Sequence, residues 1–136
     1  MKIDLPGIAD QQALVFTAAT EAAIEQLRQN LAAPRVPPQQ EVDESQYPRT
    51  HLLREAEGWH APHPDIVGAY FRHFQHHFPE YNTDRKLAQL LGLSGDRRVR
   101  EFKQGERKVP YGVWRHFLVI TGRAPQDVLP VLAYMA

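Results

Sequence analysis

The chain has 136 residues with 16 basic and 16 acidic side chains, so its formal net charge is zero. Apolar residues make up 43%, which is enough for one compact domain with an appended segment. The absence of cysteine excludes disulfides, iron–sulfur clusters, cysteine-based zinc sites and a thiol nucleophile. No apolar run reaches the roughly 18 residues that span a bilayer, and no secretory signal is visible. We therefore expect a cytoplasmic protein with no membrane partner.

The charge is unevenly distributed along the chain. Residues 1–64 hold five basic and nine acidic side chains, whereas residues 65–136 hold eleven basic and seven acidic ones. The basic excess is concentrated in residues 83–115, with nine basic and four acidic side chains. Such a division is typical of a protein in which one part binds a polyanion, although a solvated charged face is the alternative.

Taken in chain order, the first predicted element is an amphipathic helix within residues 1–33. Good helix formers fill residues 11–33, and Asp10 stands where it can cap them. Apolar residues recur at steps of three and four, forming one stripe: Phe16, Ala19, Ala23, Leu27 and Leu31. A lone helix cannot bury its own stripe, so we expect it to pack on the rest of the chain or on a second copy.

Residues 34–60 are rich in proline, glutamine and acidic residues, which predicts a linker or irregular segment. A short helix over residues 50–57 is expected within it, ended by Gly58. Trp59 follows, and we expect it to anchor this segment on the domain behind it.

Helical periodicity dominates residues 61–136, and no window alternates with period two, so we predict an all-α domain. Prolines and glycines divide it into five predicted helices, approximately residues 65–78, 83–91, 96–104, 111–121 and 125–134. Thr83 or Asn82 can cap the second of these helices, and Asp96 the third.

Residues 83–110 follow the pattern of a helix-turn-helix. Ala88 is small where two helices cross closely, and Gly92 permits the positive φ angle of a tight turn. Leu93, Val99 and Phe102 are spaced to fill the corner between the helices, so that the outer face of the second helix projects from the body.

These residues resemble a known family. Leu87-Ala88-x-x-Leu91-Gly92-Leu93-Ser94, then Val99-Arg100-Glu101-Phe102-x-x-Gly105-Glu106-Arg107-x-x-Pro110, is similar to the phage-repressor/Cro (XRE-like) helix-turn-helix regulators carried on plasmids, phages and integrated elements. The resemblance covers residues 65–122, and Trp114, Leu118 and Gly122 stand where the family packs its fourth helix. It implies a lambda-repressor-like five-helix domain with an N-terminal helical extension, which binds DNA as a homodimer on two half-sites.

The turn between Gly92 and Val99 is one residue longer than the family's usual pattern, so we assign the faces of the second helix from helical geometry. Val99 and Phe102 point inward, with Lys103 near the edge. The outward or flanking residues suit base edges in the major groove: Arg97 and Arg100 for guanine, Gln104 for adenine and Glu101 for cytosine. The residues expected to contact phosphates are Thr83, Arg85, Lys86, Arg98, Lys103, Arg107 and Lys108.

Other functions have weaker support in the sequence. The basic face can instead be a solubilising surface with ion pairs to Glu101 and Glu106. His73 and His77 have zinc-compatible spacing on one helix face, but no HExxH pattern or cysteine accompanies them, so we expect no metal. No nucleophile motif or phosphate-binding loop is present, and we expect neither an enzyme nor a cofactor.

The sequence thus predicts a sequence-specific double-stranded-DNA-binding transcriptional regulator, for example a repressor. The alternative is a protein–protein interaction adaptor on a helix-turn-helix scaffold, whose basic helix docks an acidic partner. Two segments supply apolar surface for a homodimer, residues 11–31 and residues 125–134.

Overall fold

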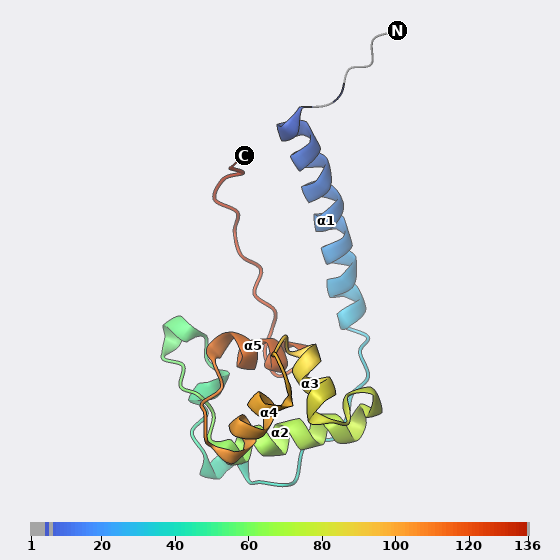
Figure 1. The fold of residues 1–136 in the computed structure, drawn as a ribbon. Helices are drawn as coiled ribbons and strands as arrows, with labels where there is room; N and C mark the ends of the chain where they lie inside the picture. The colour runs from blue at the N-terminus through green and yellow to red at the C-terminus, as the bar shows by residue number, and fades with distance from the viewer. Residues whose placement is uncertain (1–4, 6, 136) are drawn as a thin grey trace. The chain divides into compact units, whose positions relative to one another are not determined.

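The computed structural model describes residue 5 and residues 7–135, and this part of the chain is all-helical, without strands. Its five α-helices are α1 (Ile8–Asn30), α2 (Pro64–His77), α3 (Asp84–Leu90), α4 (Asp96–Gln104) and α5 (Tyr111–Ile120) (Figure 1). None of the helices in these residues combines the length and apolar character needed to cross a membrane. The chain divides into two compact units: Pro37–Asp127, and the residues before and after it.

Helix α1 belongs to the unit formed by the two ends of the chain. It begins after Gly7, which occupies the N-cap position without a side-chain hydrogen bond. Asp10 lies inside the first turn of the helix. The expected Asp10 cap is therefore wrong, because the helix starts earlier than the sequence predicts. No residue of α1 is buried, so its apolar stripe is exposed.

The predicted helix over residues 125–134 is also wrong, since residues 125–135 form no regular structure. Pro130 explains this difference, because proline inside a helix removes a hydrogen bond and clashes with the preceding turn. Of the five helices predicted over residues 61–136, the residues that the structure describes therefore form four. Within the unit formed by the chain ends, the ring of Tyr134 lies 5.0 Å from that of Phe16.

The core of the Pro37–Asp127 unit is built from the apolar faces of α2 to α5. Helix α4 packs against both α2 and α3. Trp114 of α5 is fully buried, and its ring stacks on Tyr70 of α2 with 5.7 Å between the centroids. The other large side chains that are almost completely buried come from the same helices, apart from Val109 in the loop before α5: Phe71, Ile66, Val67, Leu87, Val99, Phe102, Phe117, Leu118 and Val109.

Most of the segment expected to be a linker packs on this core. Val42, Tyr47, Leu52 and Trp59 are partly buried against it, so Trp59 is an anchor as predicted. Glu41 adds an ion pair with Arg72 of α2, at 2.8 Å. These contacts explain why the compact unit begins near Pro37.

The prediction of a single short helix over residues 50–57 is wrong. Two separate 3-10 helices, Thr50–Leu52 and Glu55–Glu57, stand in its place. Leu53 between them is extended, with a ψ angle of 164°, and this interrupts the helical path.

His51 is the buried centre of this segment. Its Nδ1 accepts a hydrogen bond from Trp114 Nε1 at 3.2 Å, and its carbonyl accepts one from Trp59 Nε1 at 3.1 Å. Burial lowers the pKa of His51 from 6.5 to about 4, even though the nearby Glu44 carboxylate favours the protonated form. The neutral ring is the form that can accept the Trp114 hydrogen bond.

We expect this histidine to make the folded state acid-sensitive. Because its folded pKa lies below the unfolded value, its contribution is complete above pH 6.5 and is lost as the pH falls towards 4. The loss at pH 4 should be about 3 kcal/mol of unfolding free energy. Urea unfolding at pH 7.5 and pH 4, followed by tryptophan fluorescence, measures it.

The control is His51→Gln, which keeps a neutral acceptor for Trp114 but does not titrate. Its stability should fall less than that of the wild type over the same pH range. Equal losses in the two proteins would contradict the role assigned to His51.

Candidate nucleic-acid interface

Helices α3 and α4 are joined by a tight turn. Thr83 caps α3, as predicted, by accepting a hydrogen bond from the Lys86 backbone N–H at 3.2 Å. Gly92 has a φ angle of +73°, the left-handed conformation that glycine adopts without strain. The N–H of Leu93 then donates to the carbonyl of the buried Ala88 at 2.8 Å, which closes the helix end.

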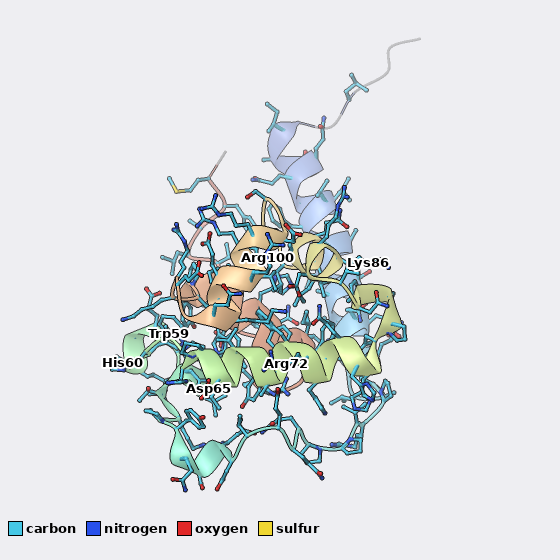
Figure 2. The ribbon with its side chains drawn as sticks, turned by 60° about the horizontal axis from the view of Figure 1, so that its bottom comes forward. Trp59, His60, Asp65, Arg72, Lys86 and Arg100 are labelled. Atoms are coloured by element: carbon cyan, nitrogen blue, oxygen red, sulfur yellow. The ribbon has the colours of Figure 1, made fainter. Side chains whose placement is uncertain are left out.

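Helix α4 has a buried face and a basic exposed face. Val99 and Phe102 are 0% and 2% exposed and belong to the core. Arg97, Arg100 and Gln104 are exposed, in agreement with the helical spacing. Asp96 is the first residue of α4 and does not cap it, because the capping position belongs to Gly95. Figure 2 shows Arg100 on α4 and Lys86 on α3.

Glu101 does not point outward, so its expected placement beside the base edges is wrong. It is only 8% exposed. Its Oε1 accepts from Arg97 Nε at 2.8 Å, and its Oε2 accepts from Arg107 Nε at 2.9 Å and Arg98 Nη1 at 3.3 Å. These hydrogen bonds compensate the carboxylate for lost water and explain how it is buried.

The protonation of Glu101 follows from the same contacts. Partial burial raises the pKa of this carboxyl group, but hydrogen bonds from Arg107 and Arg97 outweigh burial and hold the pKa below its ordinary value. Glu101 is therefore a carboxylate at neutral pH, and it is the acceptor for all three guanidinium groups.

The loop after α4 is positioned by Gly105 and by the backbone of Glu101. Gly105 has a φ angle of +78°, and a Cβ atom there would lie 2.7 Å from Pro64 Cγ. The Glu101 carbonyl accepts a hydrogen bond from the Glu106 N–H at 3.0 Å. These contacts place Arg107 beside the Glu101 side chain.

The residues expected to contact phosphate fall into two groups. Thr83, Arg85, Lys86, Arg107 and Lys108 are exposed, and Arg85 and Lys108 make no ion pair or side-chain hydrogen bond. Lys103 is partly buried, and its Nζ forms an ion pair with Asp84 Oδ1 of α3 at 2.7 Å. This ion pair connects α4 to α3. Arg98 is partly buried against Glu101. Of these basic side chains, the two without an ion pair or side-chain hydrogen bond, Arg85 and Lys108, thus lie at the start of α3 and after α4.

A hollow of about 300 Å³ lies beside Glu101, and no sequence pattern predicts it. It is lined by Ser94, Gly95, Arg97, Arg98, Glu101 and Arg107. The lining combines residues that precede α4, residues within it, and Arg107 from the loop after it. Only the fold brings Arg107 next to Arg97. The spacing of basic residues along the sequence contains no signal for this arrangement.

Other chemistry has little support from the geometry. The rings of His73 and His77 lie 4.8 Å apart, but His73 Nε2 is 2.8 Å from the Pro37 carbonyl. Over the residues that are described, no three histidine, aspartate or glutamate side chains gather as a metal site would require.

Comparisons with protein-family models, with curated proteins and with solved structures find no match to this chain. We therefore infer the function from the residues and contacts of α3, α4 and the loop that follows.

The close approach at Gly105 leads to a stability prediction. Gly105→Ala combines a left-handed alanine with a collision against Pro64, so we expect a loss of about 2–3 kcal/mol of unfolding free energy. Gly122→Ala is the matched control, since Gly122 has a φ angle of +69° but open space around its Cβ position. It should cost about 1 kcal/mol in urea unfolding. Equal costs would contradict the Pro64 contact.

Proposed function

We propose that this protein is a sequence-specific double-stranded-DNA-binding transcriptional regulator. In this proposal α3, its turn and α4 form a helix-turn-helix of the phage-repressor (XRE-like) kind, with α4 in the major groove. Occupancy of an operator then blocks or recruits polymerase. The observation that carries the proposal is the construction of α4, in which Val99 and Phe102 are buried and Arg97, Arg100 and Gln104 are exposed.

The exposed side chains of α4 have the chemistry needed to read bases. Arginine donates a pair of hydrogen bonds to the O6 and N7 atoms of guanine, and glutamine matches the N6 and N7 atoms of adenine. Arg97 and Arg100 each form an ion pair with an acid on their own helix, Glu101 and Asp96 respectively. Each keeps further N–H groups for a base, because a guanidinium has five donors.

The surrounding basic residues fit the sugar–phosphate backbone. Arg85 and Lys86 follow the N-cap of α3 and are exposed, so their positive side chains can contact phosphate. Lys108 lies in the loop beyond α4. Contacts from both places would hold α4 in one register along the groove.

We further propose a homodimer that binds two half-sites about one helical turn apart. Its support is α1, which has an apolar stripe but no buried residue. The ends of α1 carry opposite charges, Asp10 in the first turn and Arg28 in the last. In an antiparallel pair of α1 helices, Asp10 of one copy lies near Arg28 of the other. In a parallel pair, each of these charges lies beside the same charge of the second copy.

Selection of bound duplexes from a random DNA pool tests the function. A regulator of this kind should enrich one sequence motif, and a dimer should enrich a palindrome. Affinity for the enriched duplex should fall with salt, with a slope of about −0.9 per phosphate contact in a log–log plot. Absence of an enriched motif, together with flat salt dependence, would favour the protein–protein adaptor instead.

Single substitutions separate base reading from phosphate binding. Arg97→Ala and Arg100→Ala should each cost about 1–3 kcal/mol on the enriched duplex and relax the selected sequence. Lys108→Ala should weaken binding to enriched and random duplexes equally, since phosphates are the same in both. Fluorescence anisotropy with both duplexes measures these effects. If all three variants lose affinity equally on both, α4 is not reading sequence.

A charge placed within the stripe of α1 tests the homodimer. Leu27→Glu should dissociate the dimer, because it puts two carboxylates into the paired surface. Leu14→Glu introduces the same change on the opposite side of α1 and should leave the dimer intact. Sedimentation equilibrium gives the molecular mass. Loss of the dimer in both variants, or in neither, would contradict pairing through this stripe.

A further inference from the structure

Glu101 and His51 are the two buried polar side chains of the described residues, and Glu101 is the one that carries charge. Three arginines share its carboxylate. Arg97 and Arg98 come from its own helix, whereas Arg107 comes from the loop after it. A carboxylate with three guanidinium neighbours leaves a local excess of positive charge, so the cluster as a whole can still attract an anion.

The direction of these hydrogen bonds determines what each arginine can still do. Arg97 and Arg107 both donate to Glu101 through Nε. The terminal amino groups of both side chains therefore stay available for a second acceptor. The exposed fractions of these side chains are 85% for Arg97 and 54% for Arg107, so their outer ends face solvent although Glu101 holds their inner edges.

We propose that Glu101 is a positioning residue for sequence reading, and this inference rests on the proposed DNA-binding function. Its carboxylate holds the guanidinium planes of Arg97 and Arg107 before DNA arrives. The free edge of Arg97 then meets a guanine, and that of Arg107 meets a backbone phosphate. Glu101 itself touches no DNA.

The advantage of this arrangement is preorganisation. An unrestrained arginine loses rotamer freedom when it binds a base, whereas an arginine already held by Glu101 loses less. The carboxylate also repels phosphate, and this penalty applies to every duplex. The gain applies only where a base matches the held arginine, so Glu101 should increase discrimination between sequences more than total affinity.

Glu101→Gln tests this inference in the full-length chain. The variant has nearly the same shape but no charge with which to hold three arginines. Two duplexes serve as probes: the one that the wild-type protein enriches from a random pool, and a scrambled duplex of equal composition. We expect affinity for the enriched duplex to fall about tenfold, and affinity for the scrambled duplex to stay equal or rise.

Glu106→Gln is the matched control. Glu106 is exposed in the adjacent loop and makes no side-chain ion pair or hydrogen bond, and its substitution changes the net charge equally. It should raise affinity for both duplexes by the same small factor, leaving their ratio unchanged. If Glu101→Gln behaves in the same way, Glu101 acts only through its charge and the inference is wrong. A parallel loss on both duplexes with a lower melting temperature also overturns it, since the role is then structural.

A measurement without DNA separates this inference from the proposed function. In the free protein, the Nε–H resonances of Arg97 and Arg107 should exchange slowly with water. They should exchange faster in Glu101→Gln and be unchanged in Glu106→Gln. Rapid exchange in the wild type shows that Glu101 does not hold these arginines. Slow exchange in a wild type that binds no duplex shows instead that the cluster is preorganised and that the proposed function has failed.

Discussion

The packing of Val99 and Phe102 beneath α4 is the constraint on which the candidate interface depends. An isolated helix as short as Asp96–Gln104 is unstable in water, and this one carries several like charges. Two buried side chains attach it to α2 and α3, and the same attachment determines which residues face outward. Stability and exposure of the basic face therefore have one physical cause.

The second determinant is the way in which the charges of α4 are balanced. Arg100 pairs with Asp96 on the surface, a contact that contributes little because water screens it. Glu101 instead occupies a buried position and accepts from three arginines. The neutral total charge of the chain conceals this organisation, since most of its acidic residues lie outside the basic segment.

Much of the compact unit could be predicted from local sequence signals. The spacing of Val99 and Phe102 identified the inner face of α4, and Gly92 marked the end of α3 because its position requires a positive φ. The predicted C-terminal helix does not form, because Pro130 disfavours a helix despite the apolar spacing around it. Helical spacing places Glu101 outward, because it gives only the angle of a residue from Val99 and Phe102 and contains no information about the guanidinium groups that allow a carboxylate to be buried.

Local sequence patterns could not predict how the segment around His51 packs on the core, and the cause here is different. His51 and Trp114 are 63 residues apart, and nothing near His51 indicates that an indole N–H from α5 will meet its ring. The proximity of Arg97 and Arg107 likewise follows from the turn at Gly105 rather than from their spacing. Contacts between distant segments decide both features, and a pattern within one segment cannot reveal them.

An NMR titration of the full-length protein with its enriched duplex tests the central claim most directly. The account predicts that backbone amide shifts concentrate in α4, at the start of α3 and in the loop that carries Lys108, while the outer face of α2 around Arg72 stays unchanged. Shifts concentrated on that face of α2, with the amides of α4 unaffected, would contradict it.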